Sequence, residues 1–105
     1  MVIARFFVAG GALTGFKISG HAYCGSEGTD IVCAAVSSAA YMAANTVSDV
    51  IGAECSVKTG EGEMYLSLAA PDDRCAAVLK GFELHLRELA KAYPNNIKVI
   101  YGGVR

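Results

Sequence analysis

The segment from Asp30 to about Ile51 constrains the fold more than any other part of this 105-residue chain. Thr29 is a suitable helix N-cap, and the residues from 34 to 44 are almost all small or apolar. A helix that is apolar around most of its circumference must be buried on more than one side. We therefore expect it to pack against a sheet, with a second helix or a partner subunit on its other side.

The segment before this helix predicts a β-hairpin. Residues from Val2 to Ala9 and from Leu13 to Ser19 are rich in β-branched and aromatic side chains. Gly10 and Gly11 between them supply a tight turn.

The segment after the helix predicts a second hairpin, a second helix and a final strand. The hairpin strands cover residues 54–59 and 64–68, and the helix begins after Pro71-Asp72-Asp73, where acidic residues suit the positive end of the helix dipole. Residues 93–96 end that helix, and residues 97–101 form the last strand. The order is ββαββαβ, so we expect one α/β domain of the α+β type over residues 1–105, with a small mixed sheet and two helices.

Composition narrows the classes of function. Hydrophobic residues make up 53% of the chain and charged residues 18%, which suits a domain with its own core. The net charge is −1 and no run of lysine or arginine occurs, so direct nucleic-acid binding is not expected. The first ten residues do not resemble a signal peptide, and no apolar run approaches the roughly 18 residues of a membrane span. We expect a cytoplasmic protein without membrane contact.

Four cysteines occur, at positions 24, 33, 55 and 75. Without an export signal they are expected to be thiols, with Cys55 and Cys75 as small buried apolar residues. The paired short spacings of zinc sites are missing, so no metal or other cofactor is expected. A reversible disulfide between Cys24 and Cys33 is a further hypothesis.

His21 and Cys33 are the candidate catalytic residues. Cysteine attacks as the thiolate, which is favoured by a nearby histidine and by the first turn of a helix. Cys33 falls in the first turn of the predicted helix, and His21 falls at the end of the second predicted strand. The backbone amides of the same turn can stabilise an oxyanion.

The residues around this pair allow more than one interpretation. Asp30 lies three residues before Cys33, where it either orients the imidazole or only suits the helix dipole. Ser37, one turn after Cys33, either lines the site or is a small residue for helix packing. Cys33 itself is also compatible with a core position. The loop between base and nucleophile is a candidate for contacting substrate, and its residues are Tyr23, Cys24, Gly25, Ser26, Glu27 and Gly28.

The string from Ser19 to Ala22, followed after seven residues by the string from Asp30 to Ser37, resembles the ribosomal-processing cysteine protease (Prp) family of bacteria. The resemblance implies Cys33 as the nucleophile and His21 as the catalytic histidine. It also implies supporting roles for three further motif positions, which are Gly20, Asp30 and Ser37. The loop after the histidine departs from the family pattern in the order of its glycine and tyrosine residues and in its added cysteine.

The same resemblance implies an activity and partners. The activity is removal of an N-terminal extension from a large-subunit ribosomal protein, after a hydrophobic, phenylalanine-containing stretch and before a small residue. The partners are that N-terminal segment and a second copy of the chain in a homodimer. Two other functions stay open at this point, namely a non-catalytic ribosome-associated peptide-binding module and a thiol redox protein that uses Cys24 and Cys33.

Overall fold

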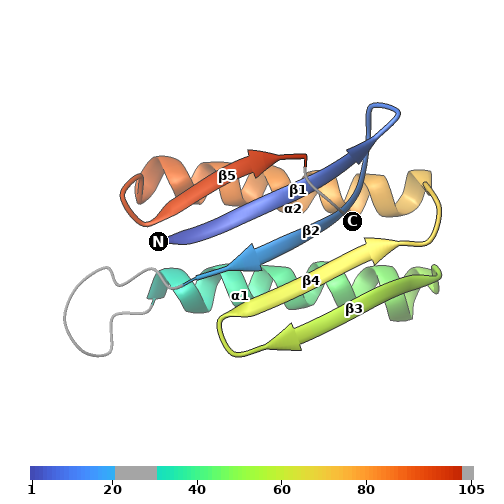
Figure 1. Ribbon diagram of the computed structural model, residues 1–105, viewed down its shortest axis with the longest axis horizontal. Coiled ribbons are helices and arrows are strands. Elements are labelled where there is room, and N and C mark those ends of the chain that lie inside the picture. The colour runs from blue at the N-terminus through green and yellow to red at the C-terminus, as the bar shows by residue number, and fades with distance from the viewer. Residues whose placement is uncertain (21–30, 103–105) are drawn as a thin grey trace.

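The predicted order of elements is confirmed by the computed structural model, which describes residues 1–20 and 31–102 (Figure 1). A five-stranded mixed sheet carries two α-helices. The second strand begins one residue earlier than predicted, at Ala12. The elements in chain order are β1 (Val2–Ala9), β2 (Ala12–Ser19), α1 (Ile31–Asn45), η1 (Thr46–Ile51), β3 (Cys55–Gly60), β4 (Glu63–Leu68), α2 (Asp73–Ala92) and β5 (Ile97–Tyr101).

The strands lie in the order β3-β4-β2-β1-β5, and both helices cover the same face of the sheet (Figure 1). The β1–β2, β2–β4 and β3–β4 pairs are antiparallel, whereas β5 lies parallel to β1. Gly10 and Gly11 have φ values of 59° and 81°, which is the conformation that a tight hairpin turn requires. No helix among the described residues covers the other face of the sheet.

Three phenylalanines join α2 to the sheet. The ring of Phe82 on α2 meets that of Phe16 on β2 at a centroid distance of 4.8 Å and that of Phe6 on β1 at 5.6 Å, both edge to face. All three side chains are buried. Each such pair contributes roughly 0.5–1.5 kcal/mol beyond the burial of its area, so this cluster fixes α2 over the centre of the sheet.

Helix α1 packs on the sheet through one face of small and branched side chains. The residues of this face are Val32, Val36, Ala40, Ala43 and Ala44. On the outer surface, Met42 is 61% exposed on α1 and Val50 is 79% exposed on η1. The second helix therefore does not cover these side chains, and the alternative cover, a partner subunit, stays a prediction. The apolar character of the outer surface of α1 therefore has no explanation in the core of one chain.

The helix predicted to run to Ile51 changes its geometry at Thr46, where η1, a π-helical segment, begins. The Thr46 hydroxyl donates to the carbonyl of Met42 at 2.7 Å, and that carbonyl is the acceptor of residue 46 in a regular α-helix. The wider turn keeps Val47 buried, and Gly52, at φ 75°, ends the segment in the left-handed conformation. The pattern of apolar residues in the sequence does not predict this change from α-helical to π-helical geometry.

The helical segment Ile31–Ile51 has 21 residues and, by length and composition alone, is apolar enough to cross a membrane. This corrects the expectation that no apolar stretch approaches that length, because its serines and threonine do not make the segment polar. The inner face of the segment belongs to the core shared with the sheet. This is the position of a core helix.

Asp72 caps the N-terminus of α2. Its carboxylate accepts hydrogen bonds from the Arg74 guanidinium at 2.9 Å and from the backbone N–H groups of Arg74 and Cys75 at 2.9 and 3.1 Å. These hydrogen bonds lower the pKa of Asp72 from 3.8 to about 2, and the Arg74 guanidinium contributes most, followed by the amide of Cys75. Because the folded pKa is depressed, the ionised cap stabilises the fold above pH 3.8, and this contribution is lost as the pH falls toward 2.

We expect Asp72→Ala to lower the melting temperature at pH 7, and the difference from wild type to shrink as the pH falls from 3.8 toward 2. Thermal denaturation followed by circular dichroism across this range measures the effect. Asp72→Asn should retain part of the stability, because asparagine is also a good N-cap. Asp73→Ala is the control, with a much smaller effect. An Asp72→Ala deficit that is equally large at pH 7 and pH 2 would contradict this account.

Candidate active site

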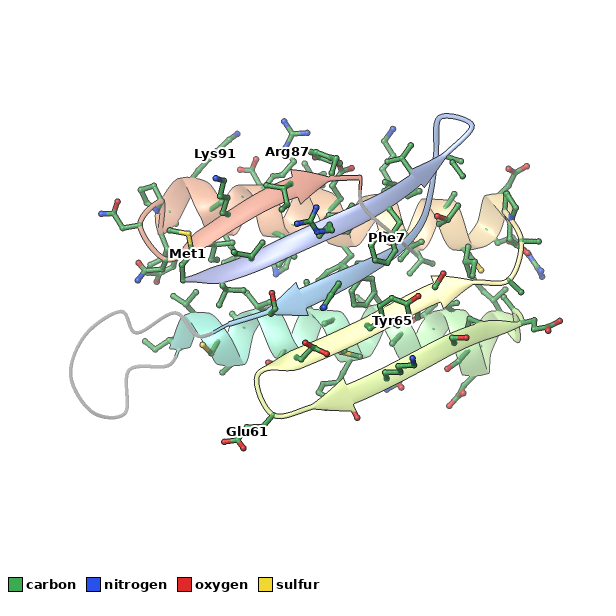
Figure 2. All side chains as sticks on the ribbon, in the orientation of Figure 1. Met1, Phe7, Glu61, Tyr65, Arg87 and Lys91 are labelled. Carbon is green, nitrogen blue, oxygen red and sulfur yellow. The ribbon has the colours of Figure 1, made fainter. Side chains whose placement is uncertain are left out.

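A cavity of about 210 Å³ lies beside Cys33, where the end of β2, the first turns of α1 and the β3–β4 turn meet. Figure 2 shows Met1 and Glu61 at this end of the molecule. The walls are mainly apolar, with a few polar groups at the rim. The residues that line the cavity are Val2, Ile18, Gly20, Cys33, Val36, Ser37, Ala40, Tyr41, Gly60, Gly62, Glu63 and Met64.

Cys33 occupies the first turn of α1, as predicted. The helix begins at Ile31, and the side chain of Cys33 is half-buried in the cavity wall. Val32 and Val36 point into the core, so the helix is held with Cys33 turned toward the cavity. The first N–H groups of a helix have no acceptor within the helix, and they carry the positive end of its dipole. A thiol at this position lies beside groups that can stabilise negative charge.

Gly20 fixes the end of β2 against two neighbouring segments. Its N–H donates to the carbonyl of Gly62 at 3.0 Å, which ties the strand end to the β3–β4 turn. Its φ is +91°, and an added Cβ would lie 2.3 Å from the carbonyl oxygen of Met1. Only glycine fits such a position. The end of β2 is therefore held on both sides.

The structure brings three of the predicted site residues together, namely Gly20, Cys33 and Ser37, all in the cavity wall. Ser37 is exposed, lies one turn after Cys33 and lines the cavity. The other predicted residues lie outside the residues that the structure describes. These are His21, Tyr23, Cys24, Gly25, Ser26, Glu27, Gly28 and Asp30, together with the predicted N-cap Thr29.

Sequence reasoning did not assign Tyr41, Glu63 or Met64 to the site. Tyr41 continues the spacing of four residues that links Cys33 to Ser37, so the helical period could have found it. Glu63 and Met64 come from the start of β4, far away in the sequence. No local pattern places β4 beside the start of α1.

Cys55 and Cys75 are kept protonated at neutral pH. Burial, followed by the charge of Asp49, raises the pKa of the Cys55 thiol. Burial, followed by the charge of Asp72, raises that of Cys75. Cys75 is fully buried as predicted, whereas Cys55 is only half-buried. Neither thiol is suited to nucleophilic attack.

His85, the second histidine of the chain, is exposed on α2 and lines a different, apolar groove between α1 and α2. It is therefore not placed to act on Cys33. Within residues 1–20 and 31–102, no group of three or more histidine, cysteine, aspartate or glutamate side chains is arranged to hold a metal ion.

The chain is similar to proteins of known activity over most of its length. It is 26% identical to the ribosomal processing cysteine protease Prp of Bacillus subtilis over an alignment of 91 residues, which covers 80% of this chain and 81% of that protein. A crystal structure from Streptococcus mutans superposes with a TM-score of 0.85 at 28% identity, covering 97% of this chain and 94% of that one.

Two further structures share the fold at lower identity. The ribosomal processing protease Prp of S. aureus, in complex with a covalently linked product peptide, has a TM-score of 0.86 at 24% identity, covering 96% of this chain and 99% of that one. The same protease in complex with a substrate peptide has a TM-score of 0.84 at 23% identity, with the same coverage. The model of the family described as cysteine protease Prp matches residues 1–98. This chain therefore belongs to the Prp family of cysteine proteases.

Proposed function

We propose that this protein is a cytoplasmic endopeptidase that removes the N-terminal extension of a bacterial large-subunit ribosomal protein, with Cys33 as nucleophile and His21 as base. The observation that supports this most is the position of Cys33, in the first turn of α1 and in the wall of an apolar cavity. A substrate held in this cavity has a thiol and the positive end of a helix dipole next to it. Family membership supports the same chemistry.

In the proposed reaction, His21 takes the proton of the Cys33 thiol, and the sulfur attacks the carbonyl carbon of the scissile peptide bond. The resulting oxyanion is stabilised by backbone N–H groups of the first turn of α1. The imidazolium returns the proton to the leaving amine, which breaks the C–N bond and leaves a thioester. Water, deprotonated by His21, then hydrolyses the thioester and restores the thiol. Asp30 is proposed to orient the imidazole.

The cavity suits an aromatic side chain next to the scissile bond. An apolar cavity of about 150 Å³ can bind benzene, and this one holds about 210 Å³ between Val36, Tyr41 and Met64. Such walls favour the hydrophobic, phenylalanine-containing stretch that the family resemblance implies. The peptides bound to the Prp of S. aureus support a peptide as the ligand. We propose that the loop from Tyr23 to Gly28 contacts this peptide, with Cys24 available for a reversible disulfide with Cys33.

The first prediction concerns the catalytic residues. Cys33→Ala should abolish cleavage of a peptide that spans the extension, while the melting temperature stays close to that of wild type because the side chain is only half-buried. His21→Ala should lower kcat/KM by about 10²- to 10⁴-fold, the usual contribution of a positioned base. Steady-state kinetics, with cleavage followed by mass spectrometry, measures both values.

The same assay separates the alternative functions. If the Asp30 carboxylate orients the imidazole, Asp30→Asn should lower kcat by more than about threefold. A smaller loss raises the activation free energy by less than roughly 1 kcal/mol and favours a role in the helix dipole alone. A Cys33→Ala variant that still cleaves would contradict the protease mechanism. Wild-type protein that binds the peptide without cleaving it would instead favour a binding module.

The second prediction concerns the cavity. Ser37 is exposed at its rim, so Ser37→Phe should fill the space without disturbing the core. We expect kcat/KM for the peptide to fall tenfold or more, mainly through KM, because a filled cavity loses substrate binding rather than chemistry. Asn45→Phe, at an exposed position at the end of α1, is the matched control. A Ser37→Phe enzyme with the kinetics of wild type would exclude this cavity as the binding site.

The third prediction concerns oligomeric state. We propose a homodimer in which a second copy covers the exposed apolar side chains of the α1 and η1 surface, such as Met42 and Val50. Met42→Glu should then shift the protein to monomers in analytical ultracentrifugation at micromolar concentration, since the charge would be buried in the interface. Val57→Glu, at an exposed apolar residue of β3, should not. Monomeric wild-type protein would contradict the dimer, and a dimeric Met42→Glu variant would contradict this interface.

A further inference from the structure

The face of the sheet opposite the helices carries a row of cations that is interrupted by one tyrosine. The strand register pairs Lys58 on β3 with Tyr65 on β4. It pairs Tyr65 with Lys17 on β2, and Lys17 with Arg5 on β1. Because neighbouring strands lie about 4.8 Å apart, this row spans roughly 14 Å across four strands. Residues distant in sequence thus form one continuous strip.

The strip is positive although the chain has a net charge of −1. Lys98 on β5 pairs with Ile3, in the next row of the same face, and adds a fourth cation. Among the strand residues, all of which the structure describes, Glu63 is the one carboxylate, and it pairs with Lys17 at 3.7 Å. Four of the nine lysines and arginines of the chain therefore share one face of the sheet.

The pairing of Arg5 with Lys17 opposes stability. Like charges directly opposite each other on antiparallel strands repel. Within the part of the chain that the structure describes, no carboxylate forms a salt bridge with Arg5. A polar uncharged residue at either position would satisfy the alternating pattern of the strands equally well. The two charges are thus more easily explained by an anionic ligand than by the fold.

Tyr65 provides an aromatic surface in the middle of the strip. Its ring lies against Phe7 at a centroid distance of 5.7 Å, and the Lys58 ammonium lies 5.7 Å from its centroid (Figure 2). The ring is half-buried, so one part of it is held by packing while another part is accessible. Ser19 and Ser67 pair with residues of this face and add hydroxyl groups.

We propose that this face of the sheet binds single-stranded RNA. Arg5, Lys17 and Lys58 contact phosphates, one base stacks on Tyr65, and serine hydroxyls meet the ribose 2′-hydroxyl groups. An acidic peptide would satisfy the cations but would not use a flat aromatic ring between them. The sequence predicted no direct nucleic-acid binding because it contains no run of basic residues. In the folded chain, basic residues from four strands come together on one face of the sheet. The proposal does not depend on the protease function.

The test is fluorescence anisotropy with a labelled 12-nucleotide single-stranded RNA, titrated with the full-length protein. With three or four phosphate contacts, the binding constant should fall about 20- to 50-fold between 50 and 200 mM salt, from a slope of about −0.7 per contact. Lys17→Gln should lower this slope by about 0.7. Tyr65→Leu should weaken binding fivefold or more at constant slope, and Tyr65→Phe should bind as wild type does, because the ring is kept.

A control variant tests whether RNA binding belongs to this face of the sheet. Lys80→Gln, on the exposed surface of α2, removes one positive charge from the helix layer and should change neither affinity nor slope. Thermal melting verifies that each variant is folded. The proposal is overturned if the RNA does not bind at 50 mM salt, or if Lys80→Gln and Lys17→Gln have equal effects. It is also overturned if a DNA of the same sequence, an abasic oligomer or a polyglutamate peptide of matched charge binds as tightly as the RNA.

Discussion

The close packing of α1 on the sheet is the contact on which the rest of the structure depends. Ala40, Ala43 and Ala44 allow the helix axis to lie near the strands, and Val32 and Val36 set its rotation. That rotation turns Cys33 toward the cavity between the helix start and the strand ends. A larger side chain on this face would displace the helix and Cys33 together. Core packing and the geometry of the candidate site are therefore one constraint in this protein.

Most of the fold could be predicted from local patterns. Alternation of apolar side chains in β4 and the helical spacing in α2 indicate elements that bury one face, and Gly10-Gly11 indicates the first turn. The change to π geometry at Thr46, where the hydroxyl donates to the carbonyl of Met42, could not be predicted, because no pattern of apolar residues marks it. The sequence predicted that the outer face of α1 is covered by a second helix or by a partner subunit, but composition does not reveal which of the two supplies the cover.

Only those residues of the candidate site that follow from local sequence patterns could be predicted. The positions of Cys33 and Ser37 follow from helical spacing, and that of Gly20 from its place after a strand. Glu63 and Met64 complete the cavity only because β4 pairs with β2 over a long separation in sequence. Such pairing is set by the global register, and no local motif encodes it.

The same register connects the cavity to the cationic strip on the other face. Ile18 and Met64 are paired residues that line the cavity, and their neighbours Lys17 and Tyr65 are paired residues of the strip. A slip of one residue in this pairing would turn Lys17 into the core and Met64 toward solvent. Burial of the apolar side chains that line the cavity thus also fixes the positions of the cations on the opposite face. A single strand pairing positions both surfaces, with one facing the helices and the other facing outward.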